Sequence, residues 1–246
     1  MSRLVRLERV DSTQMTAFAL AADGAAADGT VVVADYQASG RGRRGRTWEA
    51  SPGQSLLCTM LVRPRLAAPH WPAYSLVAAV AVAETLARTA ALAARLKWPN
   101  DVLIAGRKIA GILLESRTMG DAATTMIAVG VGINLAQRAF PAALAARATS
   151  VVIETGRTVV RDTMLASLLE AFDAWRARLE SDGMAPVRAR WLALTDTIGR
   201  RVSIDGVSGI AVDLDPDGAL VLEGAGRRHR VVAGELLEET EHAARP

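Results

Sequence analysis

The stretch Thr30-Val31-Val32-Val33-Ala34-Asp35-Tyr36-Gln37-Ala38-Ser39-Gly40-Arg41-Gly42-Arg43-Arg44-Gly45-Arg46 joins an apolar, β-branched run to a loop of glycine and arginine. The apolar run 30–34 predicts a buried strand, because β-branched residues suit a pleated surface. The glycines in the loop 40–46 let the backbone approach a ligand closely. Its arginines carry planar guanidinium groups, which pair well with carboxylates and phosphates. We therefore expect a loop that holds an anion at the end of a strand.

The glycine spacing of this loop also matches the dinucleotide-binding fingerprint, but the flanking sequence excludes that site. The fingerprint needs a helix that begins at its last glycines and an acidic residue about 20 positions further on. Here Ser51-Pro52-Gly53 breaks any helix, and Arg63-Pro64-Arg65 stands where the acid would be. A basic loop that binds RNA is the remaining alternative for these charges.

Lysine and asparagine are each used only twice, and all four residues lie between Lys97 and Asn134. Of 29 lysines and arginines together, the other positions are all arginine. Lysine offers a compact charge on a flexible stem, which a guanidinium cannot reproduce. The clustering is either chance or a sign that segments 97–101 and 107–113 carry chemistry. The neighbouring anion-binding loop favours the second interpretation.

Composition bounds the class of protein. The chain has 246 residues, is half apolar and carries a net charge of +3, which is not the balance of a protein whose main partner is DNA or RNA. The one cysteine, Cys58, can form no internal disulfide, and metal-ligand spacing is absent, so we expect a buried thiol in a reducing cytoplasm. No secretory signal is visible, and the apolar run 76–83 is too short to span a bilayer.

The pattern of apolar residues predicts an α+β domain followed by a small β domain. Asp11-Ser12-Thr13-Gln14 offers an N-cap for a first helix, and a long alanine-rich helix is expected over 73–95. Beyond residue 196, short β runs alternate with Asp-Gly and Gly-rich turns, which is typical of a small barrel. Further strands are expected near 3–10, 30–36, 55–63, 96–98, 102–105, 108–116 and 125–133, and further helices near 162–180 and 185–195.

Five segments of the chain stand out: 11–13 (DST), 35–48 (DYQASGRGRRGRTW), 97–101 (KWPND), 107–115 (RKIAGILLE) and 130–135 (GVGINL). In this order and spacing they closely resemble biotin protein ligases. The resemblance covers nearly the whole chain. It implies a mixed-sheet biotin/lipoyl protein ligase-like catalytic domain over residues 1–196 and a small Src-homology-3-like β-barrel over residues 197–246.

The activity that the resemblance implies is ATP-dependent. Biotin would be activated as biotinyl-5′-AMP and transferred to a lysine of a biotin carboxyl carrier domain of acetyl-CoA carboxylase or a related carboxylase. Two departures from the family pattern matter. Gln14 stands where the family usually has asparagine, and the motifs begin at residue 11, which leaves no room for an N-terminal DNA-binding domain. We therefore expect no repressor function and no DNA or membrane partner, with the protein a monomer or a homodimer.

The chemistry explains why cations gather here. An acyl-adenylate forms when a carboxylate meets the α-phosphate of ATP, and the two anions repel each other. Arg41, Arg43 and Lys108 would neutralise that repulsion, by positioning and electrostatic stabilisation. Mg²⁺ on the triphosphate would add to this, and no protein side chain is identified as its ligand.

The resemblance also assigns individual residues. The catalytic candidates are Lys108, Arg43 and Asp101, the last of which would orient and help deprotonate the acceptor lysine. Biotin binding is assigned to Ser12, Thr13, Gln37, Gly40, Arg41, Arg43, Lys108, Gly111, Leu113, Gly130 and Gly132. ATP binding is assigned to Arg43, Arg44, Arg46, Trp48, Asn100, Lys108 and Asn134.

Several of these residues have a structural alternative. Ser12 could cap a helix, and Gly111 and Gly132 could serve strand bulges. Asp101 could be an N-cap or a turn former, or could form an ion pair with Lys97. Core packing is an alternative for two aromatic residues, Trp48 and Trp98.

Two competing functions stay open at this point. One is a ligase for lipoate or another acid on the same fold. The other is an RNA-binding protein that uses the arginine loop and the barrel, which the modest net charge and the absence of stacking aromatics in the loop disfavour.

Overall fold

The computed structural model describes residues 3–119 and 124–238. These residues form two β-sheets, one of seven strands and one of five. The larger sheet is mixed, since β1 and β2 run parallel and the other neighbours run antiparallel. Its strands, in spatial order, are β1 (Leu4–Val10), β2 (Val31–Gln37), β3 (Ser55–Val62), β7 (Thr124–Asn134), β6 (Arg107–Met119), β5 (Asp101–Ile104) and β4 (Arg95–Lys97). The α+β class expected from the sequence is confirmed.

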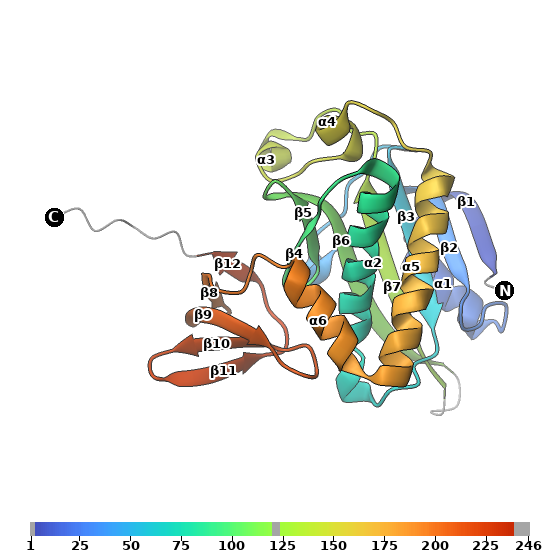
Figure 1. The fold of residues 1–246 in the computed structure, drawn as a ribbon. Coiled ribbons are helices and arrows are strands. Elements are labelled where there is room, and N and C mark those ends of the chain that lie inside the picture. Colours follow the sequence, from blue (N-terminus) through green and yellow to red (C-terminus); the bar gives the residue numbers. More distant parts are fainter. Residues whose placement is uncertain (1–2, 120–123, 239–246) are drawn as a thin grey trace.

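Helices cover the two faces of this sheet unequally (Figure 1). The long helices α2, α5 and α6 pack on one face, and α1 packs on part of the other. The helices of the described residues are α1 (Thr13–Ala22), α2 (Ala73–Ala90), α3 (Ala142–Ala145), α4 (Val151–Thr155), α5 (Arg161–Asp182) and α6 (Met184–Leu194), with short 3₁₀ turns at Arg43–Gly45 and Ala68–His70. In the part of the chain that the structure describes, each helix is too short or too polar to cross a membrane.

Alternation along the strands sends successive side chains to these two faces. Val31 and Val33 of β2 belong to the large cluster under α2 and α5, whereas Val32 belongs to a small cluster with Phe18 of α1 and Leu61 of β3. A side chain two residues from Leu61 along β3 therefore faces α1. This face carries the cavity described below.

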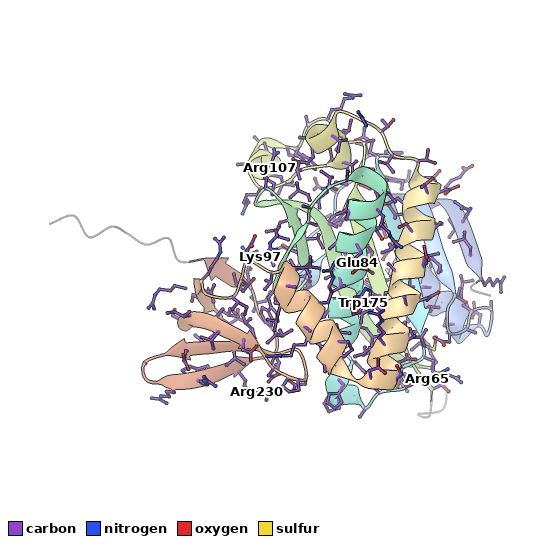
Figure 2. The ribbon with its side chains drawn as sticks, in the orientation of Figure 1. Arg65, Glu84, Lys97, Arg107, Trp175 and Arg230 are labelled. Atoms are coloured by element: carbon purple, nitrogen blue, oxygen red, sulfur yellow. The ribbon has the colours of Figure 1, made fainter. Side chains whose placement is uncertain are left out.

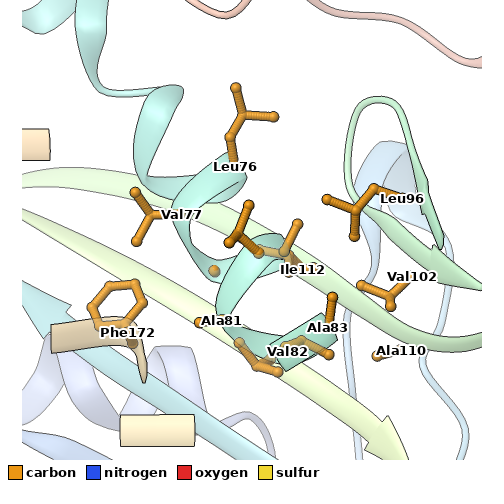
Figure 3. Packing of buried hydrophobic residues seen from close by; sticks show 14 of the residues in the cluster. Leu76, Val77, Ala81, Val82, Ala83, Leu96, Val102, Ala110, Ile112 and Phe172 are labelled. Atoms are coloured by element: carbon orange, nitrogen blue, oxygen red, sulfur yellow. The ribbon is translucent and has the colours of Figure 1, made fainter. Parts of the chain in front are cut away.

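The alanine-rich helix α2 lies almost wholly inside the protein. Its small side chains let it approach the sheet, and Val77 packs in one cluster with Ile112 of β6 and Phe172 of α5 (Figure 3). The helix ends at Ala90, because Ala91 takes a left-handed conformation with φ 54°, and β4 begins soon after. The helix expected over 73–95 was therefore about one turn too long. An alanine run gives no glycine to mark such a stop.

The smaller sheet follows α6 and is antiparallel throughout, in the order β11-β10-β9-β8-β12. Type I′-like turns close two of its hairpins, with positive φ at Asp205 and Gly206 and again at Ala225 and Gly226. The barrel strands predicted from the sequence are present, and a last short strand was missed. The strands are β8 (Arg201–Ile204), β9 (Val207–Leu214), β10 (Leu220–Gly224), β11 (Arg227–Val231) and β12 (Leu236–Glu238).

Direct hydrogen bonds join the larger sheet to the barrel and to the connection that follows α6. Trp98 is buried and its indole Nε1 donates to the carbonyl oxygen of Gly218 at 3.3 Å. Thr195 Oγ1 donates to the carbonyl oxygen of Leu96 at 2.7 Å. Trp98 is thus a core residue at the junction. Lys97, next to it, lies where the larger sheet meets the barrel (Figure 2).

We predict that Gly218→Ala destabilises the protein more than Gly226→Ala. Both glycines have positive φ, +88° and +73°, so alanine costs each about 1–2 kcal/mol of backbone conformation. Only at Gly218 would the new Cβ meet another residue, the core side chain of Leu76 at 2.9 Å, which adds about 1–3 kcal/mol of overpacking. Urea denaturation measures both free energies of unfolding. Equal losses of unfolding free energy in the two variants would show that the Leu76 side chain can shift at the junction without a free-energy cost.

Candidate functional site

A cavity of about 840 Å³ opens on the α1 face of the larger sheet. Its wall combines the start of α1, the arginine loop, β6 and β7, the segment 140–148 and barrel residues 234–237. Of the site residues predicted from the sequence, these line it: Ser12, Thr13, Gln37, Arg41, Arg43, Arg44, Arg46, Trp48, Asn100, Asp101, Lys108, Gly111, Leu113, Gly130, Gly132 and Asn134. Gly40 lines an adjoining cavity on the other side of the loop.

Neutral hydrogen-bonding groups form one cluster in this wall. The backbone N–H and the hydroxyl of Thr13 both donate to Gln37 Oε1, at 2.8 and 3.0 Å. The hydroxyl of Thr59, a residue the sequence analysis missed, donates to Thr13 Oγ1 at 2.8 Å. Ser12 is the N-cap residue of α1, but its side chain makes no capping hydrogen bond. Its hydroxyl therefore remains available to a ligand.

Gln14 closes the floor of the cavity beside this cluster. Its Nε2 donates to the carbonyl oxygens of Leu113 and Ala128, at 2.8 and 3.1 Å, and so joins β6 to β7. A Cβ on Gly130 would lie 3.1 Å from Gln14 Cδ. Gly130 thus makes room for the glutamine that stands in place of the family's usual asparagine.

The indole of Trp48 lies against two further glycines. A Cβ on Gly132 would lie 2.6 Å from the Trp48 ring, and one on Gly111 would lie 3.0 Å from Trp48 and from Lys108 Cε. The two glycines pair directly with each other in the regular β6–β7 ladder, and the irregular register lies at Ile109 instead. The strand-bulge alternative for Gly111 and Gly132 is therefore wrong.

The loop arginines differ in how they are paired. Arg44 forms a two-point ion pair with Asp205 of the barrel, both contacts at 2.8 Å. Arg41 pairs with Glu115 at 2.7 Å, and Arg46 pairs with Glu235.

Arg43 is different, because no carboxylate of the described residues forms an ion pair with it. Its Nη1 lies 3.5 Å from Asn100 Oδ1, and burial lowers its pKa. Among the arginines of the loop, Arg43 is therefore the one whose charge no carboxylate of the described residues compensates at ion-pair distance. An incoming anion would gain most at this guanidinium.

Lys108 is a second key cation of the cavity wall. Its Nζ forms an ion pair with Asp101 Oδ1 at 2.6 Å and lies 5.7 Å from the centre of the Trp48 ring. Its backbone is fixed by the neighbouring segment, since its N–H donates to Arg147 O and its carbonyl accepts from Thr149 N. Asp101 begins a strand rather than a helix, which leaves no N-cap role for it.

The two asparagines are engaged within the protein. Asn100 Nδ2 donates to Ile112 O at 2.8 Å. Asn134 Nδ2 donates to Thr149 O at 2.9 Å, and its Oδ1 accepts from Gln137 Nε2 at 3.2 Å. Each carboxamide therefore has one N–H left for a ligand, and the backbone around it is held in place.

The site thus combines a neutral hydrogen-bonding cluster with cations, Arg43 and Lys108 among them. Its volume falls within the range of small-molecule sites. Arg43 and Lys108 suit a pair of anionic groups, while Ser12, Thr13 and Gln37 suit an uncharged polar group. The described residues contain no cluster of three or more His, Cys, Asp or Glu side chains that could hold a metal ion.

Comparison with known proteins gives a consistent assignment. The model of the Biotin/lipoate A/B protein ligase family matches residues 7–134, and the model of the Biotin protein ligase C terminal domain matches residues 197–236. The chain is 39% identical over 240 residues to the biotin--[acetyl-CoA-carboxylase] ligase of Paracoccus denitrificans, covering 94% of this chain and 98% of that protein.

Two further relatives bear on the site. The bifunctional ligase/repressor BirA of Escherichia coli is 34% identical over 232 residues, which cover 92% of this chain and 71% of that protein. Among solved structures, a biotin protein ligase from Aquifex aeolicus in complex with biotin and ATP superposes with a TM-score of 0.85 at 27% identity, covering 97% of this chain and 100% of that chain.

We predict that Gly132→Ala releases the arginine loop. The new Cβ displaces the Trp48 indole, and an overpacking cost of about 1–3 kcal/mol would raise tryptic cleavage at the loop arginines by about tenfold. Gly42→Ala is the control, because its Cβ would make only ordinary contacts, at 3.4 Å or more, within the loop. Limited proteolysis with mass spectrometry compares the two. Cleavage of Gly132→Ala at the wild-type rate would show that the indole does not hold the loop.

Proposed function

This chain belongs to the biotin/lipoate A/B protein ligase family, and on that premise we propose that it activates biotin with ATP as biotinyl-5′-AMP and transfers the biotin to a lysine of a carboxylase's biotin carboxyl carrier domain. The observation that carries the proposal is the cavity itself. It brings Lys108 and Arg43 together with the Ser12, Thr13 and Gln37 cluster on one face of the sheet. The Paracoccus relative supports the carrier of acetyl-CoA carboxylase as the acceptor.

The neutral cluster suits the ureido ring of biotin. Both hydrogen-bond donors of Thr13 point to Gln37 Oε1, so the Nε2 hydrogens of the Gln37 amide are left for a ligand. Those hydrogens and the Ser12 hydroxyl can donate to the ureido oxygen. The rest of the biotin would lie along Leu113, Gly111 and Gly132. The Trp48 indole would have to move away from the two glycines first.

The cations suit the first half-reaction. The biotin carboxylate attacks the α-phosphorus of ATP, a new C–O–P link forms, and the bond to the β-phosphate oxygen breaks to release pyrophosphate. Arg43 and Lys108 would offset the repulsion between the two anions as they approach. Arg44 and Arg46 would meet the outer phosphates, while Asn100 and Asn134 would contact the adenine with their remaining N–H groups.

Asp101 connects this step to the second half-reaction. In the structure, Asp101 Oδ1 lies 2.6 Å from Lys108 Nζ. When the adenylate forms, Lys108 turns to the phosphate and the Asp101 carboxylate becomes free. The acceptor amine then attacks the acyl carbon, AMP leaves, and Asp101 would accept the proton that the amine loses.

We place Mg²⁺ on the triphosphate rather than on the protein. The described residues offer no cluster of metal-ligating side chains, and Mg²⁺ in nucleotide sites is held largely by phosphate oxygens.

A ligase for lipoate or another acid is the alternative within this family. We predict that biotin supports exchange of labelled pyrophosphate into ATP without any acceptor protein, because adenylation precedes transfer. Octanoate and lipoate are the control acids. Exchange that depends on either of them and ignores biotin would overturn the choice of substrate.

We predict that Lys108→Arg slows adenylate formation by about 100-fold, the loss typical of removing one preorganised donor in the transition state. The guanidinium keeps the charge but cannot place a compact ammonium between carboxylate and phosphate. Single-turnover measurement at saturating biotin and ATP checks this.

Lys97→Arg is the matched control for this experiment. Lys97 is the other lysine of the chain, and it also lines the cavity. We expect a smaller effect, since Lys97 supports the turn that leads to Asp101. If the Lys108→Arg variant forms adenylate at the wild-type rate, the chemistry does not require a lysine at this position.

A further inference from the structure

A buried hydroxyl within the larger sheet has, among the described residues, one hydrogen-bond partner, and that partner lies in the proposed biotin site. Thr59 is fully buried on β3, which lies between β2 and β7. It is two residues from Leu61, so its side chain faces α1. There its Oγ1 donates to Thr13 Oγ1 at 2.8 Å. A valine would fill the same space without a polar group that has to be desolvated.

The direction of this hydrogen-bond chain follows from its fixed end. A backbone N–H can only donate, so the Gln37 atom 2.8 Å from Thr13 N must be the amide oxygen. The Thr13 hydroxyl lies 3.0 Å from the same oxygen and must give it its single proton. Thr13 Oγ1 is then an acceptor towards Thr59, and the Thr59 hydroxyl supplies the hydrogen between them.

The chain therefore defines what the cavity offers. Thr13 Oγ1 accepts from Thr59, donates to Gln37 and keeps one lone pair, so it can only accept from a ligand. Gln37 has its oxygen occupied twice and presents N–H groups. A cyclic urea has the complementary pattern, with an acceptor oxygen between two N–H donors.

We infer that Thr59 is a positioning residue for biotin, which acts by holding the Thr13 side chain in its acceptor orientation from beneath the cavity. This inference rests on the proposed function, since biotin supplies the urea. Thr59 itself does not line the cavity, so its effect passes through Thr13. Hydrogen bonds in such a chain polarise one another, and loss of the buried end weakens the end that meets the ligand.

The test is Thr59→Val, assayed by biotin-dependent pyrophosphate exchange in the full chain. We expect the KM for biotin to rise about fivefold, the factor that one neutral hydrogen bond gives, with the KM for ATP unchanged. Thr59→Ser keeps the hydroxyl and should restore the KM for biotin to within about twofold of wild type.

Thr85→Val is the matched control. Thr85 is also a fully buried threonine, but its hydroxyl has no hydrogen-bond partner in the described part of the chain. The same substitution there should leave both KM values unchanged. A Thr59→Val enzyme with wild-type KM for biotin overturns the inference. Equal rises in the KM for biotin and for ATP also overturn it, because they indicate general loosening. Wild-type protein without biotin-dependent exchange would instead overturn the proposed function.

Discussion

The site depends on a steric constraint: one face of a closely packed sheet has to stay free of side chains over the area where a ligand lies. Gly111, Gly130 and Gly132 supply that area on neighbouring strands. Other side chains lie against these glycines: Trp48 against Gly111 and Gly132, and Gln14 against Gly130. They lie so close that a Cβ on any of the three glycines would crowd them. The opposite face needs no such relief, since α2 and α5 cover it with apolar side chains.

Placing the cavity on this face brings distant segments of the chain together. Thr13, Gln37 and Thr59 come from three different elements and form one hydrogen-bond chain. Lys108 meets Asp101 because β5 and β6 are adjacent antiparallel strands. The neutral and the charged parts of the site are thus held by the same sheet, which limits how far either can shift when a ligand binds.

Local signals in the sequence predicted much of the fold. The Asp205-Gly206 turn carries its own conformational requirement and has positive φ at both positions. The stop at Ala91 carries no such mark, and the segment around Arg147 is placed by a long-range backbone contact to Lys108 N. The short helix α4, by contrast, begins at a capping serine, Ser150, and ends at a left-handed glycine, Gly156, a signal that the sequence analysis did not use.

The residues of the candidate site likewise fall into those that the sequence predicted and those that it did not. Lys108 was predicted because lysine is rare in this chain, and Arg43 because it lies in the loop of glycine and arginine on which the family resemblance also rests. Thr59 was missed because a threonine in an apolar strand looks like any β-branched strand residue. The loop's carboxylate partners Glu115 and Asp205 were missed because they lie far along the chain. Residue types are visible in a sequence, whereas long-range pairing is not.

The two-domain pairing of the arginine loop has a further consequence. Arg44 and Arg46 are each neutralised by a carboxylate of the barrel, Asp205 and Glu235. A nucleotide that binds these guanidinium groups in the proposed way has to displace those carboxylates first, so the barrel's own acidic groups compete with the proposed substrate for the loop. The exchange of one counterion for another would leave Asp205 and Glu235 unpaired for as long as the nucleotide stays bound. Nucleotide binding of this kind would therefore change the surface charge beside the cavity and make the rim of the barrel more acidic at the stage when the proposed acceptor approaches.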